Sequence, residues 1–206
     1  DYINTNFRKH IITIEDPVEF VFKNKKSLIN QREVGIHTKS FASAIKASLR
    51  EDPDVIMIGE MRDPETIKAA ITLAETGHLV FSTLHTNDTV QSIDRIVDVF
   101  PAWQQEQIRM QLAMSLIGVV AQRLVPRAWK DERIPAREIL INNDAVRNLI
   151  ISWNTHQLYS VIEIWQKQWM ILMDNYLVAL YKKDFITKDV LLSYVRDKEN
   201  IEALID

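Results

Sequence analysis

Cysteine is absent from the 206-residue sequence, which excludes disulfides, thiol nucleophiles and zinc sites built on cysteine. Net charge is small as well, because 25 lysine and arginine residues face 28 aspartate and glutamate residues and leave a formal charge of -3. The sequence therefore predicts no binding of nucleic acid through its overall charge. Long apolar runs are also lacking: residues 112–120 and 170–180 are interrupted by polar side chains and fall short of the ~20 residues that a membrane span requires.

The first residues, DYIN, do not show the charged-then-apolar order of a signal peptide, so we expect none, and they resemble the end of a helix. The lack of cysteine suits a reducing cytosol. With 47% hydrophobic residues, the chain can bury one good core, and we expect one domain or one domain with an appendage.

Apolar, β-branched runs predict three buried parallel strands, at residues 10–14, 54–58 and 78–84. Residues 18–22 and 27–34 predict a small antiparallel excursion between the first two strands. Helical spacing is present at residues 41–49, with Ser40 as N-cap, at 64–76, at 89–100 and at 102–124, and a short strand is expected at 134–141. Alternating strands and helices predict an α/β fold whose mainly parallel sheet has helices on both faces.

After Asn142 the pattern becomes helical throughout. We therefore expect an α/β core over residues 1–142 and an all-helical C-terminal subdomain over residues 143–206. The aromatic residues of this tail follow helical spacing, which favours a core role over a docking surface. They are Tyr159, Trp165, Trp169, Tyr176 and Tyr181.

Polar residues follow each of the three predicted strands: EDPVE at 15–19, GEMRD at 59–63 and STLHT at 82–86. Ligands of open parallel sheets bind beyond the carboxyl ends of the strands. Each group alone is slightly better explained by helix caps or structural hydrogen bonds than by a functional site. Their shared edge favours a single site, and four apolar residues followed by Gly59 and Glu60 resemble the acidic strand of nucleotide hydrolases.

The order and spacing of five segments closely resemble the secretion-superfamily ATPases, whose members are RecA-like hexameric motors. The segments are IEDPVEF (14–20), QREVG (31–35), LREDPD (49–54), GEMRD (59–63) and TGH to TLHT (76–86), and they cover about 140 residues. In that family they correspond to the acidic box with its following loop, the Walker B strand and the histidine box. The resemblance implies a RecA-like fold, ATP and Mg²⁺ as cofactors, and assembly into a homohexamer.

The resemblance also implies roles for individual residues. Glu60 corresponds to the Walker B glutamate, and Glu15 competes with it for the role of general base. Both would hold Mg²⁺ through water, and His85 would act in catalysis. Contacts with nucleotide or Mg²⁺ are implied for Asp16, Glu19, Thr83, His78, Arg32, Arg50 and Arg62.

Residues 145–150, AVRNLI, resemble the signature helix of the type IV pilus retraction branch of this family. They are Ala145, Val146, Arg147, Asn148, Leu149 and Ile150, with Val146 in place of the usual Ile. We expect Ala145, Leu149 and Val146 on one face of a helix, with Arg147 and Asn148 turned toward solvent or a partner. The resemblance implies pilus retraction and twitching motility, partners in an inner-membrane platform protein and other pilus motors, and a cytoplasmic place at the inner membrane. Ile151-Ser152 and Trp169 depart from the branch pattern.

One family element is missing from the sequence. The phosphate loop ends in Gly-Lys-Ser/Thr, yet the four glycines, at positions 35, 59, 77 and 118, include no Gly-Lys pair. Backbone N–H groups and a lysine of that loop hold the phosphates, so this chain alone should bind ATP poorly and be inactive.

Three alternatives stay open. A paralogue that drives pilus extension or type II secretion would share most motifs. A fragment without the phosphate loop would also serve as a non-catalytic interaction module. A binuclear metal hydrolase using His78, His85, Glu15 and Glu60 is the weakest, because the two histidines point to opposite faces of one strand.

Overall fold

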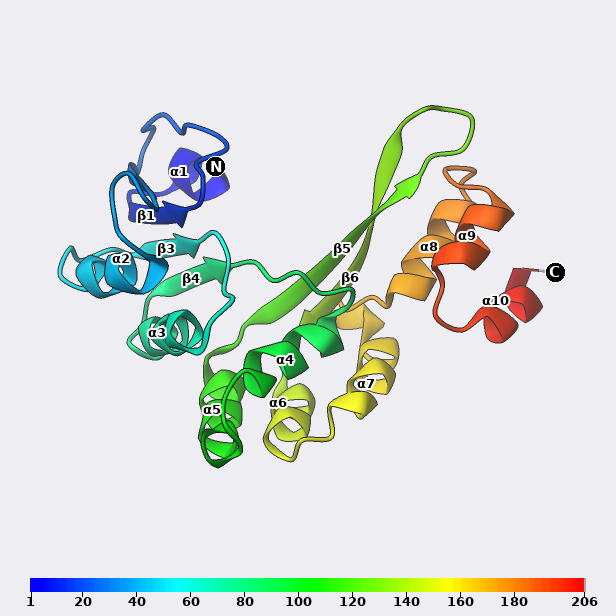
Figure 1. The fold of residues 1–206 in the computed structure, drawn as a ribbon. Helices are drawn as coiled ribbons and strands as arrows, with labels where there is room; N and C mark the ends of the chain where they lie inside the picture. The colour runs from blue at the N-terminus through cyan, green and yellow to red at the C-terminus, as the bar shows by residue number, and fades with distance from the viewer. Residues whose placement is uncertain (206) are drawn as a thin grey trace. The chain divides into compact units, whose positions relative to one another are not determined.

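The computed structural model describes residues 1–205, apart from the side chains of Lys167 and Leu204. These residues form two compact units. Unit 1 contains residues 1–85 and 96–116, and unit 2 contains residues 86–95 and 117–206. Figure 1 shows the order of the elements along the chain, from α1 (Tyr2–Asn6) to α10 (Lys198–Ile205).

Unit 1 is built on a four-stranded parallel sheet in the order β2-β1-β3-β4. The strands are β1 (His10–Glu15), β2 (Leu28–Glu33), β3 (Val55–Ile58) and β4 (Leu79–Ser82). The register sets Glu15 beside Glu33, and Ile58 beside both Ile14 and Ser82, so the four strands end at one edge. The predicted α/β class and the parallel sheet are confirmed.

The predicted antiparallel excursion is wrong. Residues 28–33 form β2, which pairs with β1 in parallel, and residues 18–22 are not a strand. The Gln31 side chain accepts a hydrogen bond from the Phe22 N–H at 2.7 Å and donates one to the Phe20 carbonyl at 2.8 Å. Side-chain bonds thus satisfy backbone groups that a strand ladder would otherwise pair.

One face of the sheet is covered by α2 (Phe41–Ser48) and α3 (Pro64–Glu75). Strand residues alternate between faces, so Ile12, Ile14, Ile56 and Ile58 all point toward these helices and are fully buried. Ser40 caps α2 as predicted, in a capping box with Ser43. The helix α5 (Ala102–Ser115) packs on α3 within the same unit.

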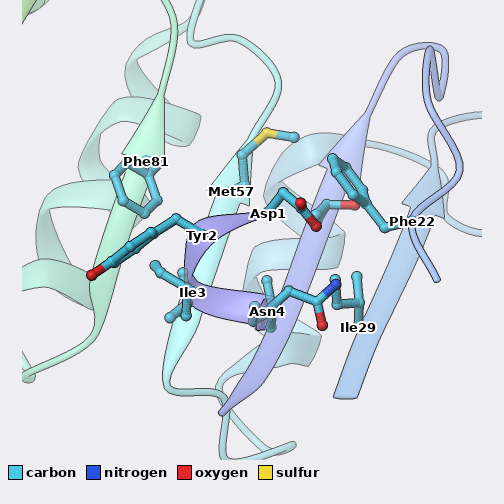
Figure 2. A pocket seen from close by; sticks show the side chains of 11 residues that line it. Asp1, Tyr2, Ile3, Asn4, Phe22, Ile29, Met57 and Phe81 are labelled. Atoms are coloured by element: carbon cyan, nitrogen blue, oxygen red, sulfur yellow. The ribbon is translucent and has the colours of Figure 1, made fainter. Parts of the chain in front are cut away.

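The opposite face of the sheet meets the short helix α1. Figure 2 shows α1 side chains beside the strands, around a pocket of about 450 Å³ whose lining is mainly apolar. Helices thus lie on both faces, as predicted. Thr13 lines this pocket, and Glu15, two residues further along β1, points to the same face. The lining residues are Asp1, Tyr2, Ile3, Asn4, Ile11, Thr13, Phe22, Ile29, Val55, Met57 and Phe81.

Unit 2 contains the antiparallel hairpin of β5 (Gly118–Pro126) and β6 (Arg133–Ile141), together with the start of α4 (Thr89–Asp98). The predicted helix over residues 102–124 is wrong in its last part, because α5 ends at Ser115 and residues 118–126 are a strand. A Cβ at Gly118 would lie 2.7 Å from the Leu140 carbonyl oxygen, so glycine permits the close pairing that starts the hairpin.

The division between the units does not coincide with the predicted boundary at residue 142. The hairpin contacts helices α8 and α9 and shares a core with them, which places residues 117–142 in unit 2. The chain after β6 is helical, as predicted: α6 (Asp144–Ile151), α7 (Leu158–Ile164), α8 (Met173–Tyr181), α9 (Lys188–Tyr194) and α10, with short 3-10 turns at Thr155–Gln157 and Gln166–Gln168.

The predicted core role of the tail aromatics holds for some of them. Tyr176 and Tyr181 pack against the core of unit 2. Trp165 and Trp169 do not: their exposed fractions are 38% and 86%. Trp169 has a left-handed backbone with φ of 67°, so one continuous helix does not run through residues 165–169 and the assumed spacing fails. Within residues 1–205, no helix is long and apolar enough to cross a membrane.

Candidate active site

The carboxyl ends of β1 and β3 lie very close together at Gly59. Its N–H donates to the Ile14 carbonyl at 2.7 Å, and a Cβ on Gly59 would lie 3.2 Å from that oxygen and 3.4 Å from Cα of Glu15. Such contacts are tighter than side chains usually allow, so glycine lets the backbone pass directly beside Glu15. The backbone therefore carries the next residue, Glu60, out of β3 beside the end of β1.

Glu60 contacts two nitrogen-bearing side chains. Its Oε2 lies 2.8 Å from Nε of Arg62 and 3.4 Å from Nε2 of His85. The Glu60 side chain is 19% exposed, whereas Arg62 and His85 are 69% and 73% exposed. A carboxylate held from one side and open on the other suits a general base that orients water, with a guanidinium and an imidazole nearby to stabilise negative charge.

Hydroxyl groups at the end of β4 fix this arrangement. The Ser82 hydroxyl donates to the Ile58 carbonyl at 3.0 Å, and the Thr83 hydroxyl donates to the Gly59 carbonyl. The Met61 N–H donates back to the Thr83 carbonyl at 3.3 Å. The loop segment that carries Glu60 is therefore hydrogen-bonded directly to the segment that carries His85. Thr83, which was predicted to contact the nucleotide, uses its hydroxyl for a hydrogen bond to the loop backbone.

Glu15 is the second acid at this edge, and it is buried, with 8% of its surface exposed. Its Oε1 accepts hydrogen bonds from the Thr13 hydroxyl at 2.6 Å and from the Gln31 amide at 3.0 Å. These two supporting residues were missed in the sequence. The alternation of β1 places Thr13 on the same face as Glu15, but Gln31 reaches Glu15 only because β2 pairs in parallel.

Other acids predicted for the site lie in loops. Asp16 and Glu19 follow β1 and are exposed. Asp63 instead caps α3, accepting bonds from the Thr66 N–H at 2.9 Å and hydroxyl at 2.7 Å. Partial burial would raise the pKa of Asp63, but the hydrogen bonds from Thr66 outweigh it and hold that pKa below its usual value.

Three predicted residues are not brought to Glu60. His78 precedes β4 at the amino edge, where its Nδ1 lies 3.0 Å from the Leu73 carbonyl oxygen and 3.1 Å from the Thr76 hydroxyl. Arg32 forms an ion pair with Glu51, and it lies beside Ile14, whose side chain faces α2 and α3. Arg50 is exposed after the end of α2. Of the predicted arginines, Arg62 contacts Glu60.

The residues fit a magnesium ion that is shared with phosphate. Among the described side chains, no group of three or more histidine, aspartate or glutamate residues is placed to hold a metal ion. Mg²⁺ at nucleotide sites keeps several waters and uses one or two carboxylates besides phosphate oxygens. Glu15 and Glu60, at adjacent strand ends, supply that donor set. The same finding argues against the binuclear metal site that was weighed as an alternative.

The AVRNLI segment lies in unit 2, in α6. Asn143 caps this helix by accepting from the Val146 N–H at 3.0 Å, and Val146 and Ile150 are fully buried. Val146 thus lies on the buried face as expected, whereas Ala145 and Leu149 are only half-buried. Asn148 is exposed as predicted. Arg147 is half-buried and its Nη1 lies 2.7 Å from Oδ1 of Asp144.

Comparison with known proteins gives strong matches over nearly the whole chain. The family described as "Type II/IV secretion system protein" matches residues 1–161. A "Twitching motility protein" of Neisseria gonorrhoeae is 49% identical over 98% of this chain and 54% of its own length. The "Type IV pilus retractation ATPase PilT" of Pseudomonas aeruginosa is 46% identical over 97% of this chain and 58% of its own.

Solved structures of related proteins also match nearly the whole chain. The "Crystal Structure of the Pilus Retraction Motor PilT and Bound ADP" has a TM-score of 0.90 and 50% identity, covering 98% of this chain and 57% of that one. The ATPase DotB of Legionella pneumophila has a TM-score of 0.81 and 27% identity, with 96% of this chain covered. The chain thus spans a little over half the length of these relatives.

Proposed function

The chain belongs to the Type II/IV secretion system protein family, and we propose that it is the C-terminal part of a motor that couples ATP hydrolysis to type IV pilus retraction. The observation that carries this proposal is Glu60, held at the end of β3 between Arg62 and His85. Relatives named as a twitching motility protein and a pilus retraction ATPase support it, each about half identical over almost the full chain.

In the proposed mechanism Glu60 orients and deprotonates the attacking water. Glu60 suits this role better than Glu15, because Glu15 is buried and already accepts two hydrogen bonds, whereas the neighbours of Glu60 are exposed side chains. Arg62 and His85 then stabilise charge on the transferred phosphoryl group. When bound, Mg²⁺ would neutralise phosphate charge, and Glu15 and Glu60 would hold its water ligands.

The relatives also support proposals about assembly and place. We propose that the complete motor is a homohexamer that works in the cytoplasm at the inner membrane, with a platform protein and other pilus motors as partners. ADP bound in a structural relative supports nucleotide as the ligand. The binding of the β- and γ-phosphates needs a Gly-Lys-Ser/Thr loop, which this sequence does not contain.

The enzymatic part is tested by comparing two proteins. One is the chain itself, and the other is an extended chain, in which the N-terminal part of the Neisseria relative, where we expect the phosphate loop, precedes Asp1. We expect steady-state phosphate release from the extended chain and none from the chain alone. An extended chain that assembles and binds ATP but releases no phosphate would favour a non-catalytic interaction module.

The retraction part is tested at α6. In the extended chain, Arg147→Ala should leave ATP hydrolysis and hexamer formation intact and abolish twitching motility, because α6 contributes no residue to the Glu60 site. Asp144→Ala is the matched control: it breaks the 2.7 Å ion pair but keeps the arginine, and motility should persist. Full motility of Arg147→Ala would contradict a coupling role for this helix.

A further inference from the structure

The loop that follows β1 carries two of the predicted site acids, Asp16 and Glu19, and has little apolar packing at its middle. Two of its large apolar side chains, Phe20 and Val21, have exposed fractions of 74% and 86%. Residues 16–22 also lie outside the helices and strands, so no ladder of backbone bonds holds them. Hydrogen bonds from side chains are therefore the main contacts that can fix this part of the loop.

Two side chains of β2 supply such bonds. Oε2 of Glu33 accepts from the Val18 N–H at 3.0 Å. The Gln31 side chain accepts from the Phe22 N–H at 2.7 Å and donates to the Phe20 carbonyl at 2.8 Å. The loop is thus tied to β2 at three backbone groups, two of which bond to Gln31.

Gln31 bonds to the carboxylate of Glu15 as well. The parallel register pairs Gln31 with Thr13 of β1, which places its side chain on the face that Glu15 occupies. Nε2 of Gln31 donates to Oε1 of Glu15 at 3.0 Å, and the Thr13 hydroxyl donates to the same oxygen at 2.6 Å. Within the described part of the chain, Oε2 of Glu15 accepts no hydrogen bond. Glu15 therefore has one oxygen bound to the fold and one left for water or a ligand.

The backbone of the loop fixes the orientation of the Gln31 amide. Its two N–H groups donate to Glu15 and to the Phe20 carbonyl, and its oxygen accepts from the Phe22 N–H. A reversed amide would place its oxygen against two acceptors and its NH₂ group against the N–H of Phe22. The loop thus ensures that Gln31 presents a donor to Glu15.

We propose that Gln31 is a positioning residue that joins the acidic loop to Glu15 and leaves Oε2 of Glu15 as the oxygen that holds water ligands of Mg²⁺. The bond between Gln31 and Glu15 belongs to the chain itself, whereas the role of Oε2 toward Mg²⁺ rests on the proposed function. Hydrogen bonds behind a metal-binding carboxylate orient it, and their removal commonly weakens metal binding or activity about 10- to 100-fold.

The position of Glu15 is tested on the chain itself, without nucleotide. NMR measures the side-chain ³J couplings of Glu15, which report whether its torsions keep one value or average over several, and the hydrogen exchange of the Phe22 amide. Gln31→Met keeps the size of the side chain and removes its amide, so the Glu15 torsions should average and the Phe22 amide should lose protection.

Gln31→Glu separates the two contacts and also serves if Gln31→Met does not fold. It keeps an acceptor for the Phe22 N–H but has no donor for Glu15. The Phe22 amide should therefore stay protected while the Glu15 torsions average. Unchanged Glu15 couplings in these variants would overturn the proposal.

Asn24→Ala is the matched control in the same loop. Oδ1 of Asn24 accepts from the Ile29 N–H at 2.9 Å, and this bond involves neither Glu15 nor residues 18–22. The Ile29 amide should lose protection, whereas the Glu15 couplings and the Phe22 amide should not change. Averaging of the Glu15 torsions to the same extent as in Gln31→Met would mean that any loosening of the loop releases Glu15, which would also overturn the proposal.

The consequence for Mg²⁺ is tested in the extended chain. Gln31→Met should raise the Mg²⁺ concentration for half-maximal phosphate release about 10- to 100-fold. The same change should cause a smaller loss in a Glu15→Gln background, because its effect passes through Glu15. Equal losses in both backgrounds, or an unchanged Mg²⁺ dependence, would overturn the assignment of Oε2. An extended chain without turnover would contradict the proposed function, and the ³J couplings would still decide whether Gln31 positions Glu15.

Discussion

The two edges of the parallel sheet carry the same kinds of side chain and use them differently. At the amino edge, Asp54 accepts from Nζ of Lys9 at 2.7 Å and from the His10 N–H at 2.8 Å, and His78 bonds to the Leu73 carbonyl. At the carboxyl edge, Glu60 contacts Arg62 and His85, which are largely exposed.

The difference lies in the partners. A side chain bonded to backbone is held as part of the fold, because its partner cannot move without the strand or helix that carries it. A side chain whose partners are exposed can exchange them for a ligand at little cost. The type of partner, more than the type of residue, separates structural groups from candidate catalytic ones in unit 1.

The largest effect is expected at Glu60. In the extended chain, Glu60→Gln should keep nucleotide binding and lower kcat by about 10²–10⁴-fold, because the amide keeps the shape and cannot take a proton. Phosphate release and a nucleotide titration measure the two properties, and the exposed Glu65→Gln is the control. Loss of nucleotide binding would point to a structural role, and unchanged turnover would move the base to Glu15.

The two histidines that flank β4 should respond in opposite ways. His85→Ala should lower kcat by about 10- to 150-fold, since a hydrogen bond to a charged group contributes about 1.5–3 kcal/mol. His78→Ala should instead lower the thermal midpoint by about 2–4 °C, the effect of losing about 1 kcal/mol in a protein of this size. A drop in turnover for His78→Ala with unchanged stability would contradict the division between the two edges.

A smaller effect is expected at the close contact between β1 and β3. Gly59→Ala should destabilise the chain by about 1–3 kcal/mol, because the new Cβ would lie 3.2 Å from the Ile14 carbonyl oxygen. Urea unfolding measures this loss. Gly118→Ala, whose Cβ would lie 2.7 Å from the Leu140 carbonyl oxygen, is the comparison in unit 2. In the extended chain, turnover should fall with Gly59→Ala and persist with Gly118→Ala.

The smallest effect is a pH dependence at the amino edge. The hydrogen bond from Lys9 and then that from the His10 N–H hold the pKa of Asp54 below its ordinary value of 3.8. The folded state thus prefers the ionised form, and this stability is present above about pH 4 and lost as pH falls through the lowered pKa. Asp54→Asn should flatten the decline of the unfolding free energy between pH 4 and pH 2, and Lys9→Met should flatten part of it. An unchanged slope in both variants would show that Asp54 contributes nothing to it.

Much of the carboxyl edge of the sheet could be predicted from the sequence. Apolar runs followed by Glu15, by Gly59-Glu60 and by Thr83 to His85 predicted three strand ends, and all three belong to one parallel sheet. Such a prediction is possible because strands of one direction end at one edge, so a residue's place follows from its offset within its own strand. The sequence also shows directly that it contains no Gly-Lys pair of a phosphate loop.

The pairing of strands with partners that are distant in the sequence could not be predicted in this way. The β2 segment was expected to pair antiparallel, and 118–126 was expected to be helical, because alternation and apolar content do not specify which neighbour a strand meets. In the tail, Trp165 and Trp169 follow a spacing that a left-handed residue interrupts.

Local order along the chain was enough to place Glu60 and His85 at the carboxyl edge of the sheet, since the position of each follows from the strand just before it. Assembly in three dimensions was needed to separate His85 from His78, to pair Arg32 with Glu51 instead of a ligand, and to bring Glu138 to Thr89, 49 residues away. Those contacts depend on strand register and on which face a side chain occupies. The packing of many residues together sets both the register and the face, because a register shift of one residue would move every side chain of a strand to the opposite face of the sheet.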